Sequence, residues 1–403
     1  MIGAGVVGIS AAIALQGRGL AVRVIDVNAP GTGCSFGNAG VIGPSIIPLS
    51  ASYGLAKLPR IFLSRTSPAS LDLASLPGLV RWGLHYARAT GATRARRDIE
   101  TLHEICPFSY SAWQRLAGER FSEVPKIGYL TVFLQGGEAG SAAPTLALRR
   151  SLGVRMRELD ASSIAALEPM FAGIACGGLL MEEAGHVRNP HAFVTGLSDL
   201  FLARGGEIVR DRVVRVRSLA SGEVLAEGEA QDYRADSLVI AAGAHCNALL
   251  KGLGHRIPLI SERGYHWEVS LGGADLGRSV LLPSLGAVLT PSDAGARLAG
   301  LSQFGMPGFA ARPRLIEELL TRLRAVLPHV AGLSDHPIWS GERPTTPDSI
   351  PVIERVPGQA NVYLNTGHGH GGLTMGASSA FLLTELMSGR VEPLHDKLSS
   401  RRF

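Results

Sequence analysis

Three glycines near the start of the chain have the spacing of a phosphate-binding loop. The first eight residues read M-I-G-A-G-V-V-G and contain the pattern G-x-G-x-x-G, and the apolar run over 9–16 predicts a helix directly after it. Such a loop lets the backbone approach a pyrophosphate, and the N-terminus of the helix attracts its negative charge. We therefore predict a dinucleotide cofactor. The residues predicted to bind it here are Gly3, Gly5, Val6, Val7 and Gly8.

An acidic residue stands where the same kind of cofactor requires one. The β-branched run over 20–25 predicts a buried parallel strand, and Asp26 closes it. A carboxylate at this place can accept hydrogen bonds from both hydroxyls of a ribose. The glycine pattern alone is weak evidence because the chain has 50 glycines. The order of loop, helix, strand and acid supplies the context that makes it specific.

A second stretch rich in glycine and small polar residues follows at 31–40, with the sequence G-T-G-C-S-F-G-N-A-G. Such a run can wrap phosphate and ribityl groups closely, because small residues leave the backbone accessible. The alternative is an ordinary surface loop, and composition alone favours that alternative. The residues around it decide between the two interpretations.

The order of these motifs resembles a known family. G-x-G-x-x-G, an aspartate and S-F-G-N-A-G follow one another as in the D-amino-acid oxidase and dehydrogenase superfamily of FAD enzymes. Residues 341–353 resemble that family's G-x-R-P-x-T-x-D-x-x-P-x-I signature, and residues 361–375 resemble its final strand, glycine-rich loop and helix. The resemblance covers the whole chain. It is greatest to bacterial D-amino-acid dehydrogenases, including those acting on D-hydroxyproline.

The resemblance implies an α/β fold, with a Rossmann-like FAD-binding domain and an interleaved α+β substrate domain built on an antiparallel sheet. We assign the FAD-binding domain to 1–50, 188–254 and 338–403, and the substrate or cap domain to 51–187 and 255–337.

Local patterns predict the elements between the motifs. Residues 94–97 read as a solvated turn and 98–116 as a helix, whereas 127–134 read as a strand. Residues 256–305 alternate with turns, which is typical of antiparallel strands. A helix is expected over 313–327.

The same resemblance implies further contacts with FAD. In the family, the serine and the Asn-Ala-Gly segment of the second glycine-rich stretch lie along the pyrophosphate and flavin. The backbone of a valine contacts the adenine ring, and an A-A-G turn follows a buried strand. The last glycine-rich loop and the helix after it contact the flavin. The residues at these positions are Ser35, Asn38, Ala39, Gly40, Val213, Ala242, Gly243, Gly369, Gly371, Gly372, Leu373 and Thr374.

Three residues are candidates for the chemistry on the substrate. Arg343 resembles the family's carboxylate-binding arginine, and a planar guanidinium suits a carboxylate best. His370 and the nearby His368 flank the last glycine-rich loop, where they could contact substrate, tune the flavin or bond only to backbone. Tyr265 begins a strand and could face the substrate, although a strand tyrosine is more often part of a core.

These residues predict an FAD-dependent D-amino-acid dehydrogenase. A D-amino acid, with D-proline and D-hydroxyproline among the candidates, would lose its Cα hydrogen as hydride to flavin N5, and a quinone or another acceptor would take the electrons. A glycine- or sarcosine-type amine oxidase that uses oxygen is one alternative. A truncated, non-catalytic flavoprotein is another. A single-domain NAD dehydrogenase would leave 35–40 and the C-terminal loop without a role.

Composition limits the partners. The chain has 403 residues and a net charge of +5, without a block of Lys and Arg, so nucleic acid is not an expected partner. The four cysteines lack metal-ligand spacing, and only Cys34 lies in a motif, so we expect no metal and a non-covalent FAD. The apolar clusters and basic residues of 41–82 either pack on the protein, which we favour, or contact a membrane surface.

We expect a cytoplasmic protein, with the inner face of the cytoplasmic membrane as the alternative location. Only Met1 and Ile2 precede the first glycine. A central strand usually has more residues, so we also expect the natural start to lie upstream.

Overall fold

A parallel sheet forms the centre of the first half of the molecule in the computed structural model, which describes residues 1–52, 67–122 and 124–403. Ile2 bridges Ile25 on one side and Ile240 on the other. It therefore lies between β1 (Arg23–Asp26) and β12 (Leu238–Ile240). On the outer side of β1 runs β8 (Glu207–Arg210), and beyond β12 lie β20 (Val362–Thr366) and the antiparallel β19 (Val352–Arg355).

Helices cover one face of this sheet. α1 (Val6–Gln16) and α12 (Gly372–Met387) pack together, with α6 (Ser109–Ala117) and α9 (Pro190–Ala203) beside them. α1 is apolar around its whole circumference, as expected for a helix enclosed on all sides. The resulting core includes Ile9, Trp113 and Phe201, which are fully buried.

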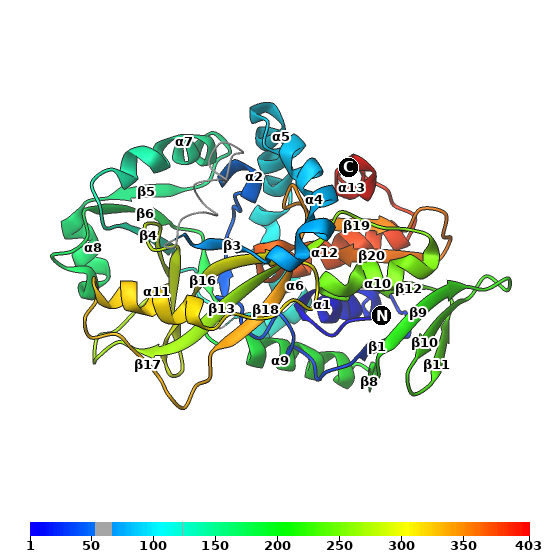
Figure 1. Ribbon diagram of the computed structural model, residues 1–403. Helices are drawn as coiled ribbons and strands as arrows, with labels where there is room; N and C mark the ends of the chain where they lie inside the picture. Colours follow the sequence, from blue (N-terminus) through cyan, green and yellow to red (C-terminus); the bar gives the residue numbers. More distant parts are fainter. Residues whose placement is uncertain (53–66, 123) are drawn as a thin grey trace.

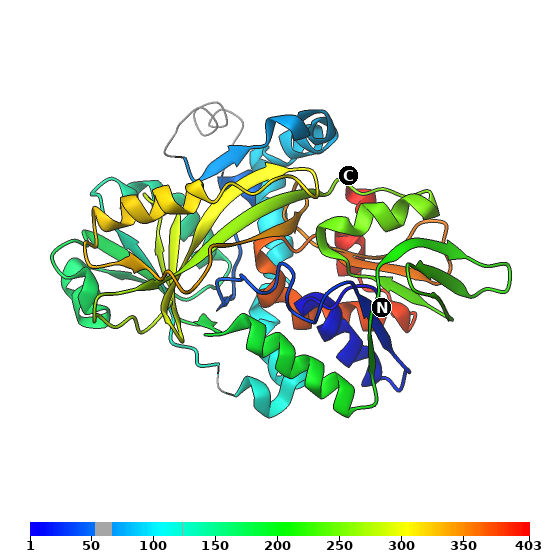
Figure 2. The same ribbon diagram turned by 60° about the horizontal axis from the view of Figure 1, so that its bottom comes forward.

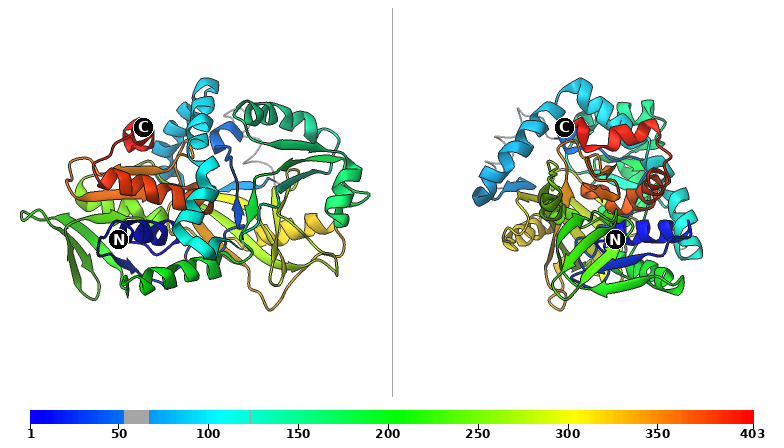
Figure 3. Two further views of the ribbon diagram at one scale, coloured as in Figure 1. Left: turned by 180° about the vertical axis from the view of Figure 1, so that it is seen from behind. Right: turned by 90° about the vertical axis from the view of Figure 1, so that its right-hand side faces the viewer.

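The other face carries a small antiparallel sheet and a short helix. The strands are β9 (Val213–Ser218), β10 (Val224–Gly228) and β11 (Asp232–Ala235), and the helix is α10 (Cys246–Leu250). The three strands extend away from the body of the molecule at the right of Figure 1. Both chain termini lie in this half, as Figure 3 shows.

The second half is built on a ten-stranded, mainly antiparallel sheet. Its longest strands, β13 (Ile260–Ser270) and β16 (Gly295–Gly305), pair with each other. The other strands are β3 (Ala69–Leu71), β4 (Tyr129–Phe133), β5 (Met156–Leu159), β6 (Gly177–Met181), β14 (Val280–Leu282), β15 (Ala287–Ser292), β17 (Ala331–Gly332) and β18 (Trp339–Thr345). The helix α11 (Arg314–Arg324) lies along this sheet in Figure 2 and contributes four buried side chains to its core. α7 (Glu138–Ser151) and α8 (Ala161–Leu167) lie at the far end.

The remaining helices and strands join the two halves or lie at the surface. β2 (Val41–Ile42) pairs with β7 (Gly185–His186) between the halves. The other α-helices of the described residues are α2 (Leu49–Ser52), α4 (Leu76–Ala89), α5 (Ala92–His103) and α13 (Pro393–Leu398). In the described part of the chain, no helix has the length and apolar character needed to cross a membrane.

The predicted fold class is confirmed, and the antiparallel region over 256–305 is present. Two local predictions are wrong. Residues 94–97 belong to α5, because the arginines there lie around a helix whose inner side buries Ile99 and Leu102. The expected helix over 98–116 is two helices, broken where Pro107 follows Cys106 in a short 3-10 turn.

Candidate functional site

The first glycine-rich loop is held so tightly that side chains are excluded at two of its glycines. Gly3 has φ +109°, and a Cβ there would lie 2.4 Å from the carbonyl oxygen of Ala241. A Cβ on Gly8 would lie 1.9 Å from the carbonyl oxygen of Gly3. The loop is therefore clamped between the end of β12 and the first turn of α1. Gly3 also donates its amide to the Ile25 carbonyl at 2.9 Å, which joins the loop to β1.

The start of α1 lies beside two residues of the predicted cofactor site. The helix begins after Gly5, which has no side chain to cap it, and no described side chain accepts a hydrogen bond from the Val7 or Gly8 amide. The Val6 amide donates to Ser35 Oγ at 2.9 Å, and the Ala4 amide donates to Asp26 Oδ2 at 2.7 Å. Ser35 and Asp26, both predicted as cofactor contacts, thus border the same loop. The partial positive charge of a helix N-terminus, with amides left free to donate, attracts an anion.

The second glycine-rich stretch closes against the strands between the two halves. Asn38 Oδ1 accepts the Gly40 amide at 2.8 Å, and the Asn38 carbonyl accepts from Arg297 Nη1 at 2.9 Å. Gly40 has φ +77°, and a Cβ there would lie 2.2 Å from the Val187 carbonyl oxygen. Ala39 lies between these two anchored residues. The stretch is therefore a fixed part of the structure and not a free surface loop.

The last glycine-rich loop brings a second helix N-terminus beside the first. α12 begins after Gly371 without a side-chain cap from the described residues. The position of a Cβ on Gly372 lies 3.8 Å from Val6 Cγ1, and one on Gly371 would meet Ile46 Cδ1 at 2.5 Å. Gly369 has φ +50°. The starts of α1 and α12 thus lie side by side, and both present backbone amides.

The other predicted contacts surround these two helix ends. Leu373 is buried, with its carbonyl accepting from Trp113 Nε1, and Thr374 Oγ1 donates to the Val41 carbonyl at 3.3 Å. Ala242 and Gly243 follow β12, and the Gly243 carbonyl accepts from Thr366 Oγ1 at 3.0 Å. Val213 begins β9, two residues after Asp211, whose amide donates to the Asp26 carbonyl.

A buried glutamate joins Arg343 to His370. Glu262 Oε1 lies 2.5 Å from His370 Nε2 and 3.4 Å from Arg343 Nη1. Glu262 is completely buried, whereas the side chains of Arg343 and His370 are 21% and 48% exposed. The pairing of β13 with β18 places Glu262 opposite Arg343. The group therefore has one buried anion and two accessible nitrogen side chains.

Further bonds fix the carboxylate of Glu262. Ser302 Oγ donates to Oε1 at 2.5 Å, and Thr345 Oγ1 donates to Oε2 at 2.9 Å. Burial acts to raise the pKa of Glu262, but the charge and hydrogen bond of His370, the Arg343 charge and the Ser302 hydroxyl outweigh it and lower the pKa to about 2. The carboxylate is thus ionised at neutral pH.

The guanidinium of Arg343 lies over a bare backbone. A Cβ on Gly264 would lie 2.0 Å from Arg343 Nη2 and 2.2 Å from Cζ. Arg343 Nη1 also donates to the Leu301 carbonyl at 3.3 Å, and Leu301 has φ +64°, which is unusual for a residue other than glycine. Gly264 therefore makes the space that the flat guanidinium occupies.

The model of the family described as FAD dependent oxidoreductase matches residues 1–386. The chain belongs to this family of FAD-dependent oxidoreductases. It is an enzyme of the oxidoreductase class, and FAD is its cofactor.

Curated relatives match the chain over nearly its full length. A D-amino-acid oxidase of Bradyrhizobium diazoefficiens is 28% identical, with 97% of this chain and 94% of the relative covered. The D-amino acid dehydrogenase 2 of Ralstonia nicotianae is 29% identical, with 97% of this chain and 96% of the relative covered.

Solved structures share the fold. Glycine oxidase from Geobacillus kaustophilus has a TM-score of 0.73 and 20% identity, with 97% of this chain and 94% of that chain covered. L-proline dehydrogenase from P. horikoshii has a TM-score of 0.74 and 16% identity, with 100% of this chain and 96% of that chain covered.

The residues present fit FAD. The clamped glycines at Gly3 and Gly8 expose backbone where a pyrophosphate can approach, and the first turn of α1 has amides beyond that of Val6 that no described side chain accepts from. The start of α12 beside it offers a second set of donors for the electron-rich edge of the flavin. Both sets lie in the part of the structure that also holds Arg343 and His370, since His370 directly precedes Gly371.

Tyr265 does not lie with the other two catalytic candidates. It is buried on the face of β13 opposite Glu262, where its hydroxyl donates to Gln303 Oε1 and accepts the Arg312 amide at 2.8 Å. Because successive strand residues point to opposite faces, Glu262 and Tyr265 cannot both face Arg343. We correct the expectation that Tyr265 faces the substrate. His368 is also buried, with Nε2 3.0 Å from Ser379 Oγ, and burial lowers its pKa to about 3.

Sequence reasoning missed the residues that hold the group together, namely Glu262, Ser302 and Thr345. The sequence does hold a signal for Glu262. It stands two residues before Gly264 in E-R-G-Y-H, so the two positions lie on the same face of the strand. Its meaning depends on the pairing with β18, which the sequence does not show.

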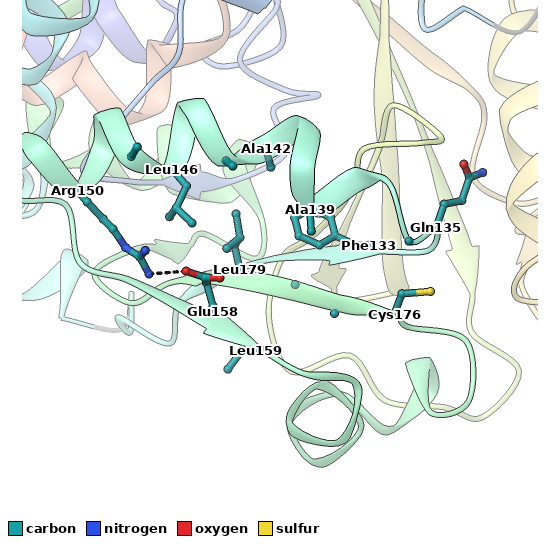
Figure 4. Close-up of a pocket in the computed structure, with 15 residues that line it drawn as sticks. Phe133, Gln135, Ala139, Ala142, Leu146, Arg150, Glu158, Leu159, Cys176 and Leu179 are labelled. Carbon is teal, nitrogen blue, oxygen red and sulfur yellow. Dashed lines mark ion pairs between the residues drawn. The ribbon is translucent and has the colours of Figure 1, made fainter.

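A cavity of about 380 Å³ lies elsewhere, between α7 and the strands β5 and β6. Figure 4 shows Leu146 and Leu179 on its apolar side, with the ion pair of Arg150 and Glu158 at one end and Cys176 at the other. None of the predicted site residues lines this cavity. Within the described ranges, no group of three or more His, Cys, Asp or Glu side chains is placed to hold a metal ion.

Proposed function

We propose that the protein oxidises a D-amino acid to the imino acid. The observation that carries this proposal is the position of the Arg343 guanidinium. It lies over Gly264, and its Nη1 atom is 3.2 Å from Nε2 of His370, in the loop that precedes α12. A carboxylate is the planar partner that this fork suits. The D-amino-acid relatives named above support the amino-acid class and its configuration.

The chain's own residues position the substrate. Arg343 binds its carboxylate, and the amino group then points toward His370, the other exposed nitrogen side chain of the group. FAD, held by the glycine-rich loops and the starts of α1 and α12, would supply the hydride acceptor at its N5 atom, and a quinone would take the electrons. Holding the Cα hydrogen in line with that acceptor supplies much of the rate acceleration, and no strong base is needed for this step.

Anaerobic bleaching of the bound flavin tests the substrate. A panel of D-amino acids should include D-proline and cis-4-hydroxy-D-proline, with the L-enantiomers, glycine and sarcosine as comparisons. We expect at least one D-amino acid to bleach the flavin faster than its L-enantiomer does. If only glycine or sarcosine bleaches it, the proposal is wrong, and the protein is an amine oxidase of the alternative class.

The acceptor is tested on the reduced enzyme. We expect a water-soluble quinone to reoxidise the flavin at least about ten times faster than dissolved oxygen at equal concentration. Faster reoxidation by oxygen would make the protein an oxidase.

We further propose that α4 contacts an anionic membrane surface. Leu76, Val80 and Leu84 follow one another at helical spacing and are 44%, 61% and 61% exposed, and Leu73 before the helix is 70% exposed. The two arginines of the same helix, Arg81 and Arg88, are exposed as well. The opposite side of α4 packs on the protein through Leu79 and Tyr86. The basic residues of 41–82 at positions 57, 60 and 65 lie outside the described residues.

Vesicle sedimentation tests this contact. The holoenzyme should sediment with vesicles of phosphatidylglycerol and phosphatidylcholine, and a variant with Val80→Ser and Leu84→Ser should do so much less. The exposed Val214→Ser on β9 is a matched control. Equal sedimentation of both variants would contradict the proposal.

A further inference from the structure

We propose that Glu262 is a positioning residue that sets the tautomer of His370, so that His370 Nδ1 accepts a proton from the substrate amine. This inference rests on the proposed function, because it assigns a role to the group beside Arg343. It adds a proton acceptor and the residue that orients it.

The geometry fixes which ring nitrogen carries the proton. Glu262 Oε1 lies 2.5 Å from His370 Nε2, and the carboxylate is completely buried. An ionised carboxylate at this distance requires a donor, because a lone pair on Nε2 would repel it. Arg343 Nη1, which can only donate, lies farther from Nε2, at 3.2 Å. The shorter contact with the carboxylate therefore places the proton on Nε2, and in the neutral ring Nδ1 is left as the acceptor.

The other ring nitrogen, Nδ1, belongs to a side chain that is half exposed. The His370 side chain is 48% exposed, and no described residue forms a hydrogen bond with its Nδ1. Among the described residues, the contacts of the ring are at its Nε2 end, so Nδ1 can meet a small amine held by Arg343. Glu262 in turn is held by Ser302 and Thr345, which prevents it from turning away.

The proposed oxidation of the substrate balances in protons and electrons. The substrate ammonium gives one proton to His370 Nδ1, which leaves a neutral amine and an imidazolium paired with Glu262. The Cα hydrogen would then leave with both bonding electrons as hydride to the flavin of FAD, which would be reduced by two electrons, while the nitrogen lone pair forms the C=N bond of the iminium product. The imidazolium returns its proton to water, which its exposure permits.

Few other charged groups can produce the same pH dependence. Arg343 faces His370 from β18 and Glu262 faces it from β13. Cys34 lies near the same charges, but burial raises the pKa of its thiol to about 11. Glu342 and Arg263 form an ion pair with each other on the opposite face of β13 and β18.

The first test reads the tautomer without turnover. In the FAD-loaded protein labelled with ¹⁵N-histidine, NMR should show His370 with hydrogen on Nε2 at high pH, and His370→Gln assigns the signal. Glu262→Gln should weaken or reverse this preference, because an amide can donate as well as accept. A wild-type His370 protonated on Nδ1 would overturn the proposal.

The second test reads the rate of flavin reduction against pH, using whichever amine bleaches the flavin best. We expect Glu262→Gln to lower the limiting rate about tenfold or more and change the substrate Kd by less than about threefold, since the base is weakened and the carboxylate site is kept. The acidic limb of the profile should move to lower pH. Glu262→Asp keeps the charge and should retain part of the rate. This variant replaces Glu262→Gln in the experiment if Glu262→Gln is unstable.

Glu168→Gln is the matched control. Glu168 is also buried and pairs with an arginine, Arg278 at 2.7 Å, but it lies away from the site. It should lose stability and keep the wild-type profile. If Glu262→Gln behaves like Glu168→Gln, Glu262 is structural only and the inference is wrong. If no D-amino acid bleaches the wild type, the proposed function fails, while the tautomer still decides the role of Glu262.

Discussion

At the scale of single residues, the fork of Arg343 matters more than its charge. Arg343→Lys keeps the charge but loses the paired donors, so we expect the Kd for the reducing D-amino acid to rise by about tenfold or more. Gly264→Ala should have a similar effect, because its Cβ would lie 2.0 Å from Arg343 Nη2. Titration of flavin bleaching measures both.

Arg263 is the matched control for this prediction. It lies on the same strand as Glu262 but faces the other way, where it pairs with Glu342 at 2.5 Å. Arg263→Lys should leave the Kd unchanged. An equal rise in Kd for Arg263→Lys and Arg343→Lys would mean that the effect comes from the sheet and not from a carboxylate contact.

The cysteines indicate how FAD is attached. Cys34 lies in the second glycine-rich stretch, and burial keeps its thiol protonated by raising the pKa to about 11. Thiolate is the reactive form, so Cys34 is a poor nucleophile. We expect acid precipitation to leave all the FAD in the supernatant and a colourless pellet. A yellow, fluorescent pellet would contradict a non-covalent cofactor.

At the scale of elements, the start of α1 depends on Gly8. A Cβ there would lie 1.9 Å from the Gly3 carbonyl oxygen, which is backbone and cannot move aside. Gly8→Ala should therefore lower the affinity for FAD by at least about tenfold and lower the melting temperature. Fluorescence titration of the apoprotein with FAD measures the first effect.

Gly33 provides the comparison within the second glycine-rich stretch. A Cβ there meets nothing within 4 Å, and its φ is ordinary for other residues. Gly33→Ala should bind FAD like the wild type. Equal losses in the two variants would show that flexibility, and not the close approach at Gly8, governs binding.

The elements that the sequence predicts well are those with local causes. The glycine loops at Gly3 and Gly40 are visible because close backbone approach excludes every other residue. The break before α6 was missed although Pro107 is a local signal. The roles of Glu262 and Tyr265 were not predictable, because the strand face that each occupies has meaning only once β13 and β18 are paired.

At the scale of the whole molecule, the chain end is tied to the first half through charges. Arg402 Nε lies 2.7 Å from Asp348 Oδ2, and Arg94 on α5 donates to the Arg402 carbonyl at 2.8 Å. Asp98 lies within this group, is 5% exposed, and its Oδ2 has no hydrogen-bond partner among the described residues. The group therefore includes a carboxylate that costs stability when it is ionised.

This cost predicts how stability depends on pH. Burial, with the charge of Asp348 next, raises the pKa of Asp98 from 3.8 to about 7, although nearby arginines oppose the rise. Above pH 7 the folded protein holds the buried charge, and between pH 7 and 4 it takes up a proton that the unfolded chain does not, so this group favours folding more as the pH falls. Asp98→Asn should raise the melting temperature by a few degrees, roughly 2–6 °C, at pH 8 and by little near pH 4. The exposed Asp199→Asn on α9 should show no such difference between the two pH values. A lower melting temperature for Asp98→Asn at pH 8 would mean instead that Arg94 and Arg402 require the charge.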